Sequence, residues 1–260
     1  MPTLIRRVPV AAMLAAALIS SIAGVGQAAL VLSLDSSNGS NVLNASDNPA
    51  SHGEAIAHWL DATGAPLSAT AQTGNPVYDI DGGPLQQPVI DFSTGSGARM
   101  ITTDAVQART ISMVHRWDTT PIGGSYLFDL RAGIPNSYVW QGGWGANWTV
   151  YVNSSSVPAS SIGQLRNDTW QTTTFVGTST ESGVLNIFSR FENNEFGLGK
   201  VAEIRIYDTA LTEAERLAVV DELAGKWLPP IAIPQEVLIP IASATASSTS
   251  INTAEVLIIN

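Results

Sequence analysis

The residues best placed to do chemistry lie in one short segment near the end of the chain, residues 201–207, which read VAEIRIY. A period of two is typical of a strand with one buried face, and it sets Glu203, Arg205 and Tyr207 on the same side. A retaining glycosidase needs two carboxyl groups about 5 to 5.5 Å apart. Here arginine and tyrosine occupy the positions of further acids, and a neighbouring arginine keeps Glu203 ionised, whereas a general acid must hold its proton. We therefore expect no catalytic dyad, but an exposed Glu203–Arg205 pair worth about 1 kcal/mol or less.

No histidine or serine lies in a recognisable catalytic or metal-binding motif. The chain has 3 histidines, and His52, His58 and His115 show neither the H-x-H nor the H-E-x-x-H spacing of a metal site. The G-x-S-x-G turn of serine hydrolases does not occur. In MVHRW, alternation places His115 on the face of Met113, so we expect a core histidine.

A second group of candidate residues is aromatic and lies in residues 137–153, SYVWQGGWGANWTVYVN. Trp140 and Trp148 fall in alternating segments and are expected in the core, where large aromatic side chains dominate. Trp144 differs, because it lies in GGWGAN and glycines cannot cover a large side chain. We expect an exposed Trp144 indole. The alternative is that it folds back onto the rim of the domain.

An exposed indole beside amide groups suits a sugar, because sugars present apolar C–H faces and hydroxyl edges. Trp144 would provide the stacking face and Asn147 the amide hydrogen bonds. Tyr138 and Asn153 complete the predicted ligand-binding set.

A third candidate is the acidic turn YDIDGG, residues 78–83. Asp79 and Asp81 alternate in front of two glycines, and calcium prefers several oxygen ligands of this kind. Two carboxylates are too few for a full site, so Asp61 or Asp91 would have to contribute. An ordinary Asp-Gly turn is the alternative. Calcium is the one cofactor that the sequence suggests.

The elements that must position these residues are short apolar runs separated by Gly, Pro, Asn, Asp and Ser. Between residues 29 and 190 no segment has a convincing helical period, and turn signals recur at intervals of roughly 8 to 15 residues. About ten strands are predicted. Two antiparallel sheets packed as a sandwich are the simplest way to bury one face of each strand.

One helix is predicted directly after the charged strand. Apolar residues recur every three or four positions from Leu217 to Trp227, as in a short amphipathic helix. Thr212 followed by Glu215 has the form of a capping box, and the prolines that begin at Pro229 end the helix.

The two ends of the chain differ from the part between them. Residues 1–28 have two arginines, an apolar run and small residues at the end, which predicts a secretory signal peptide. The apolar run is shorter than the about 20 residues that cross a bilayer, so we expect no membrane span in the mature chain. Residues 229–260 are rich in proline, serine and threonine, and predict a linker or the start of an incomplete further module. Residues 29–228 form the predicted sandwich domain.

Composition excludes several classes of function. The chain has 0 cysteines, which excludes disulfides and thiolate metal sites. Its formal net charge is −10, which repels polyanions and excludes nucleic acid as a partner.

The order of these parts resembles a known family. An opening LSLD, then WLD, then PVIDF, and finally G-x-V-A-E-I-R-I-Y-D-x-A-L-T-x-A-E-R before a helix resemble laminin G-like domains of the concanavalin A-like lectin and glucanase superfamily. The resemblance implies a jelly-roll sandwich whose first and last strands are neighbours, in some members with calcium at a loop rim. Hydrolases of this superfamily have a strand of the form E-x-D-x-E, and this chain has E-I-R-I-Y instead.

These observations together predict an all-β, two-sheet antiparallel jelly-roll sandwich with one short C-terminal helix. The predicted function is a non-catalytic module that binds a polysaccharide or cell-surface glycan and is secreted, periplasmic or held at the cell surface. Two alternatives stay open: a glycan hydrolase or lyase on the same fold, and a structural or adhesive spacer.

Overall fold

The computed structural model describes residues 28–94, 97–119, 124–130, 137–192 and 195–230. The described residues up to Pro229 belong to one compact unit. The predicted signal peptide, apart from Ala28, and the predicted tail from residue 231 onward lie outside the described residues.

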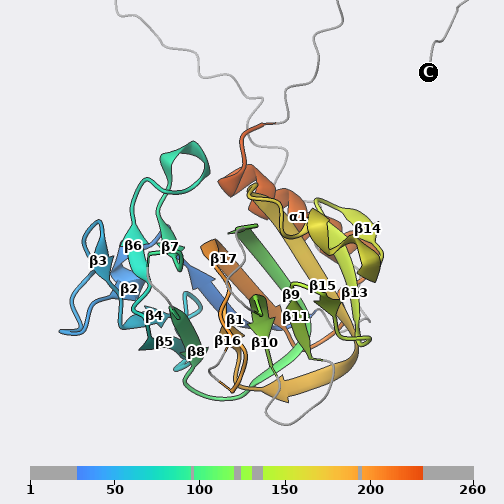
Figure 1. Cartoon of the computed structure of the whole chain (residues 1–260). Coiled ribbons are helices and arrows are strands. Elements are labelled where there is room, and N and C mark those ends of the chain that lie inside the picture. Colours follow the sequence, from blue (N-terminus) through green and yellow to red (C-terminus); the bar gives the residue numbers. More distant parts are fainter. Residues whose placement is uncertain (1–27, 95–96, 120–123, 131–136, 193–194, 231–260) are drawn as a thin grey trace, which may run out of the picture. The chain divides into compact units, whose positions relative to one another are not determined.

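The chain forms two antiparallel sheets and one helix, as the sequence predicts (Figure 1). The first sheet has nine strands, and β1 (Leu30–Asp35) pairs with β17 (Gly199–Tyr207), so the first and last strands are neighbours. The other strands of the first sheet are, in spatial order, β14 (Ser155–Val157), β13 (Trp148–Val152), β15 (Gln171–Gly183), β9 (Val106–Trp117), then β17, and then β7 (Val89–Asp91), β6 (Val77–Asp79) and β3 (Glu54–Ala55).

The second sheet has eight strands, most of them short. In spatial order they are β12 (Gly143–Trp144), β11 (Tyr138–Trp140), β10 (Tyr126–Asp129), β16 (Asn186–Ile187), β8 (Arg99–Thr102), β5 (Ser68–Thr73), β4 (His58–Leu60) and β2 (Val42–Leu43). The sequence does not predict β2, β5, β6, β8, β12 or β14, because runs of two to six residues with few β-branched side chains give little periodicity.

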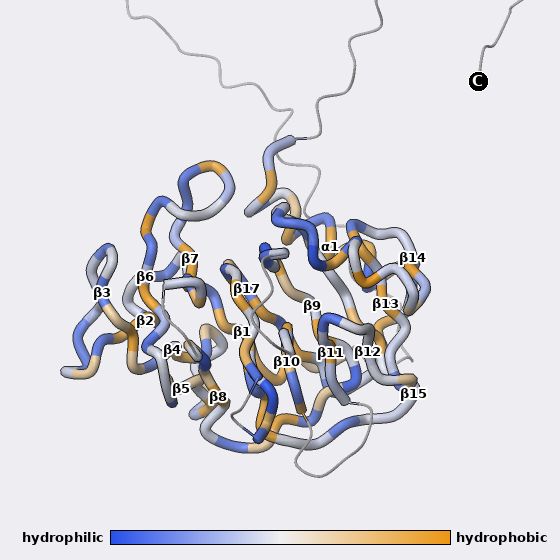
Figure 2. The backbone as a smooth tube through the Cα atoms, in the orientation of Figure 1, coloured by the Kyte–Doolittle hydropathy of each residue, from blue (hydrophilic) through white to orange (hydrophobic). Residues whose placement is uncertain are grey.

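The main core contains buried residues of both sheets. Phe128 of the second sheet meets Phe175 of the first edge to face, with ring centroids 4.9 Å apart. Ile204 and Ile206 lie in the same core, as the alternation of β17 predicts. In Figure 2 the strands show short hydrophobic stretches between hydrophilic ones, the pattern of elements buried on one face.

A register shift in β17 corrects the predicted alternation at one point. The pairing of β17 with β9 is irregular between Val201 and Glu203. Val201 therefore joins the main core together with Ile204, instead of sharing the outer face with Glu203.

Helix α1 (Glu213–Trp227) covers part of the outer face of the first sheet. Thr212 and Glu215 form the predicted capping box. A second, smaller core joins the helix to the sheet through Val89, Val114, Ala202, Leu223 and Trp227. No helix in the described part of the chain has the length and apolar character that crossing a bilayer requires.

Candidate functional site

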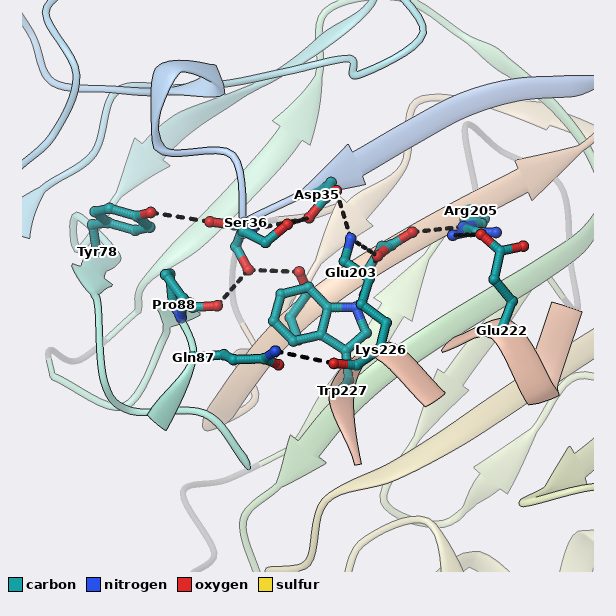
Figure 3. Close-up of polar contacts among 12 residues, drawn as sticks. Asp35, Ser36, Tyr78, Gln87, Pro88, Glu203, Arg205, Glu222, Lys226 and Trp227 are labelled. Atoms are coloured by element: carbon teal, nitrogen blue, oxygen red, sulfur yellow. Dashed lines mark hydrogen bonds and ion pairs between the residues drawn. The ribbon is translucent and has the colours of Figure 1, made fainter. Parts of the chain in front are cut away.

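Glu203 lies buried under α1, so the prediction of an exposed ion pair is wrong. Only 1% of the residue is exposed. Its carboxylate accepts hydrogen bonds from Arg205 Nε at 2.6 Å, Lys226 Nζ at 2.7 Å and Trp227 Nε1 at 2.8 Å (Figure 3). Two of these donors lie in the last turn of α1, and alternation within a strand cannot place them. The carboxylate anchors the helix to the sheet.

Asp35 and Glu222 extend this network to either side. Asp35 is the register partner of Glu203 and accepts a hydrogen bond from Lys226 Nζ at 2.6 Å. Glu222 accepts one from Arg205 Nη2 at 2.8 Å, and this bond lowers the pKa of the Glu222 carboxyl. Burial by itself would lower the pKa of Arg205, but the bonds to Glu222 and Glu203 outweigh burial and raise that pKa.

Asp35 and Glu203 are two carboxylates on neighbouring strands, yet their surroundings disfavour catalysis. Lys226 bonds to both carboxylates, and Glu203 is covered by the helix. A catalytic acid must hold its proton and reach a substrate, whereas these acids are matched by cations beneath a packed element. We interpret this network as the structural lock of α1.

The acidic turn gains a histidine that the sequence does not predict there. His52, Asp79 and Asp81 each offer one ligand atom, and these atoms lie within 4.8 Å of one another. His52 Nδ1 is 3.6 Å from Asp79 Oδ1 and 3.7 Å from Asp81 Oδ1. Because His52 lies far from this turn in the chain, no local spacing could reveal the grouping.

A lysine completes the acidic turn where calcium would need a further acid. Lys200 Nζ is 2.6 Å from Asp79 Oδ2 and 3.1 Å from Asp91 Oδ2. Burial raises the pKa of Asp79, but the bond to Lys200 outweighs it and leaves that pKa lowered. Asp61 lies elsewhere and accepts a hydrogen bond from the Ser33 amide. An ammonium and an imidazole nitrogen do not suit calcium, which prefers oxygen ligands. The calcium site stays a prediction, and we propose no role for it.

The two tryptophans of the aromatic segment exchange their predicted places. Trp144 lies in β12, half-buried and packed against the main core, and its pair partner is the buried Val139. Trp140 follows Val139 directly and therefore points to the opposite, outer face of the second sheet, where it is half-buried. The predictions of an exposed Trp144 and a core Trp140 are wrong. Trp148 is buried, as predicted.

Trp140 belongs to a group of three rings that we call the aromatic cluster: Tyr126, Tyr138 and Trp140. The Tyr126 ring centroid is 6.3 Å from that of Trp140 and 6.2 Å from that of Tyr138. Tyr138 is half-buried, whereas Tyr126 is buried beside it. A Cβ atom at Gly142 would lie 2.6 Å from the Trp140 ring, so the turn after β11 requires glycine at this position.

Asn147 does not face the aromatic cluster but binds a buried acid. Its Nδ2 donates to Glu181 Oε1 at 2.9 Å. Ser137 and Ser179 donate to the same carboxylate at 2.6 and 2.7 Å. These bonds join β15 of the first sheet to the start of β11 in the second. Asn147 therefore helps to hold in place the segment that carries the aromatic cluster.

Asn153 lies apart from the other predicted ligand-binding residues. It occupies the turn between β13 and β14 of the first sheet, with a positive φ of 45°. Its Oδ1 accepts a hydrogen bond from the Thr172 amide at 3.0 Å. The structure assigns Asn153 a turn-forming role, and the predicted set of four residues does not converge.

The residues on the outer face of the second sheet line up across six strands. Direct register partners share a face, so the pairing of β11, β10, β16, β8, β5 and β4 defines one row. This outer row consists of Tyr138, Asp129, Asn186, Ile101, Thr70 and His58. Asp129 and Asn186 are buried and the other four are half-buried. The aromatic cluster forms one end of this row.

His115 is a core residue, as predicted. It is fully buried in β9, and its Nε2 lies 2.9 Å from Thr173 Oγ1. Its Nδ1 has no hydrogen-bond partner among the described residues. Burial lowers the pKa of His115 to about 3, so the imidazole is neutral near pH 7 and no substrate can reach it.

Comparisons with known proteins identify no family. Neither a scan against family models nor a search of curated proteins gives a match. Among solved structures, the chain is similar to Trypanosoma rangeli sialidase in complex with the inhibitor DANA, with 14% sequence identity and a TM-score of 0.43. The match covers 74% of this chain and 32% of the sialidase chain. A likeness of this extent says nothing about the activity of the present chain.

Proposed function

We propose that this protein is a non-catalytic, laminin G-like carbohydrate-binding module whose ligand lies on the outer face of the second sheet. The carrying observation is the aromatic cluster, in which Trp140 and Tyr138 stay half-buried beside Tyr126. On the first sheet, by contrast, α1 covers the Glu203 side of β17.

The chemistry of this face suits a saccharide. Half-buried aromatic rings stack on the C–H faces of sugar rings, and polar side chains beside them can bond to hydroxyl groups. Trp140 provides the stacking ring in this proposal, a role that the sequence assigned to Trp144. Tyr138 keeps its predicted place among the ligand-binding residues. Asn147 acts indirectly, through the bonds to Glu181 that hold the segment.

Binding without catalysis is proposed from the acids of the same face. The outer row has one carboxylate, that of Asp129, which accepts a hydrogen bond from the Phe191 amide at 3.2 Å. Retaining and inverting hydrolases both need a pair of carboxyl groups across the scissile bond. The other pair of neighbouring acids, Asp35 and Glu203, is part of the lock of α1.

The proposed setting follows from the predicted ends of the chain. We propose export through the signal peptide, with the sandwich of residues 29–228 acting outside the cytoplasm and residues 229–260 serving as linker. The partner would then be a polysaccharide or a surface glycan.

The test compares two tryptophans of the same hairpin. Binding of the purified protein to a panel of neutral and acidic polysaccharides is measured by affinity electrophoresis and calorimetry, for the wild type, Trp140→Ala and Trp144→Ala. Stacking on Trp140 predicts a loss of affinity of about ten- to a hundredfold in Trp140→Ala, in line with about 1 to 3 kcal/mol for burying a large side chain. Trp144→Ala is the matched control, because that side chain packs against the main core.

Each other outcome supports a rival function. Equal binding by the wild type and Trp140→Ala would remove the ligand from this face. Failure to bind any glycan would favour the structural spacer. Release of reducing sugar would make the protein a hydrolase.

A further inference from the structure

Arg99 is a buried arginine without a partner. Only 8% of the residue is exposed. Its Nε and Nη1 have no hydrogen-bond partner, and no ion pair joins Arg99 to any acid among the described residues. Other arginines behave differently: Arg116 pairs with Asp118, Arg190 with Glu195 and Arg205 with Glu203 and Glu222.

Arg99 lies on the face proposed for ligand binding. It begins β8 between Ala98 and Met100, which both belong to the main core, so its own side chain points to the outer face. Ile101, two residues further along the same strand and on the same face, is a member of the outer row.

An unpaired buried guanidinium is costly, because a desolvated charge without a counter-charge loses its hydration and gains nothing. Burial lowers the pKa of Arg99, which reflects this cost. Arginine nevertheless stays protonated in proteins and cannot remove the cost by losing its proton. A group that satisfies these donors must therefore come from outside the described residues. A planar anion fits best, since guanidinium binds carboxylates through two parallel hydrogen bonds.

We propose that Arg99 recognises a carboxylate group on the saccharide, so that the ligand is an acidic glycan. This inference rests on the function proposed above and names its ligand class. The net charge of −10 disfavours dense polyanions. A polysaccharide with isolated uronic acid side groups on a neutral backbone therefore fits better than a heavily sulfated one.

The experiment uses matched polymers. Affinity of the full protein is measured for native glucuronoxylan, for the same polymer after chemical reduction of its carboxyl groups, and for dextran sulfate against dextran. The variants are Arg99→Met, Arg99→Lys and, as a matched control, Arg109→Met. Arg109 lies in β9 of the first sheet, is half-buried and also has an unpaired Nε.

A carboxylate contact predicts three results. Wild type binds native glucuronoxylan about ten- to a hundredfold more tightly than the reduced polymer, as expected for hydrogen bonds to a charged group. Arg99→Met binds both polymers equally, at the lower affinity. Arg99→Lys keeps the charge without the fork and falls between them. Arg109→Met behaves as the wild type.

The contrary results separate this inference from the proposed function. Equal binding of native and reduced glucuronoxylan by the wild type would overturn the role of Arg99 and leave a neutral-glycan module. Tighter binding of dextran sulfate would replace the carboxylate by a sulfate. No binding to any polymer would overturn the proposed function itself. A weaker but still carboxylate-selective Arg99→Met, with an unchanged melting temperature, would assign the selectivity to another residue.

Discussion

The outer faces of the two sheets bury charged side chains in opposite ways. On the first sheet, Glu203 is met by three donors from β17 and α1. On the second, Arg99 is buried without any such partner. The first arrangement is complete within the protein and holds a helix. The second is incomplete, and an incomplete buried charge points to a group that the protein meets elsewhere.

Removing Glu203 should have the largest effect on stability. Glu203→Ala leaves Arg205, Lys226 and the Trp227 indole without their acceptor under the helix. Breaking a buried ion pair costs about 3 to 5 kcal/mol. Urea unfolding followed by tryptophan fluorescence measures the loss. Glu222→Gln is the control, because the Glu222 side chain is 64% exposed and an exposed pair is worth about 1 kcal/mol or less. Equal losses in the two variants would show that the lock is not specific to Glu203.

Trp144 and Trp140 should separate stability from binding. Trp144→Ala removes a half-buried ring packed on the main core, and we expect a loss of about 2 kcal/mol, below the about 3 to 5 kcal/mol for a fully buried tryptophan. Trp140→Ala should lose less stability and more glycan affinity. Thermal melting and binding isotherms on the same samples measure both quantities. A Trp140 variant that is the less stable of the two would place its ring in the core after all.

Acid should destabilise the protein through His115. The pKa of His115 falls from 6.5 to about 3 on folding, because burial disfavours the charged imidazolium. Between these two values the unfolded chain binds the proton and the folded chain does not, so stability is lost as pH falls through this window. The slope is at most about 1.4 kcal/mol per pH unit. Unfolding of the wild type and His115→Gln from pH 7 to pH 4 should show a smaller pH slope in the variant. Parallel slopes would assign the acid sensitivity to carboxylates alone.

Arg99→Met should have the smallest effect on stability, and the opposite sign to Glu203→Ala. Replacing a buried, unpaired charge by an apolar side chain of similar length removes a desolvation cost, so we expect no change or a gain of about 1 kcal/mol. The same urea titration measures it. A loss as large as that of Glu203→Ala would mean that Arg99 is part of the fold, and the contrast between the two faces would disappear.

Much of the fold could be predicted because it depends on neighbours in the chain. The capping box of Thr212 and Glu215 needs residues three positions apart, and the burial of Ile204 and Ile206 follows from a period of two. His115 is placed correctly for the same reason. The short strands of the second sheet were missed, since two to six residues with few β-branched side chains carry little pattern.

The candidate site could not be predicted to the same extent. Trp140 and Trp144 are separated by a turn whose register decides which ring faces the core, and glycines on either side leave that register unmarked. The grouping of His52 with Asp79 likewise depends on two loops that only folding brings together.

The sequence by itself determined the class of fold, the closing strand and helix, and the lack of an E-x-D-x-E strand, because local period and residue type decide these. Tertiary structure alone decided which charges are paired. Glu203 found its partners in a helix more than 20 residues away, whereas Arg99 found none on its sheet. Electrostatic pairing depends on distance in space, and no pattern along the chain measures that distance.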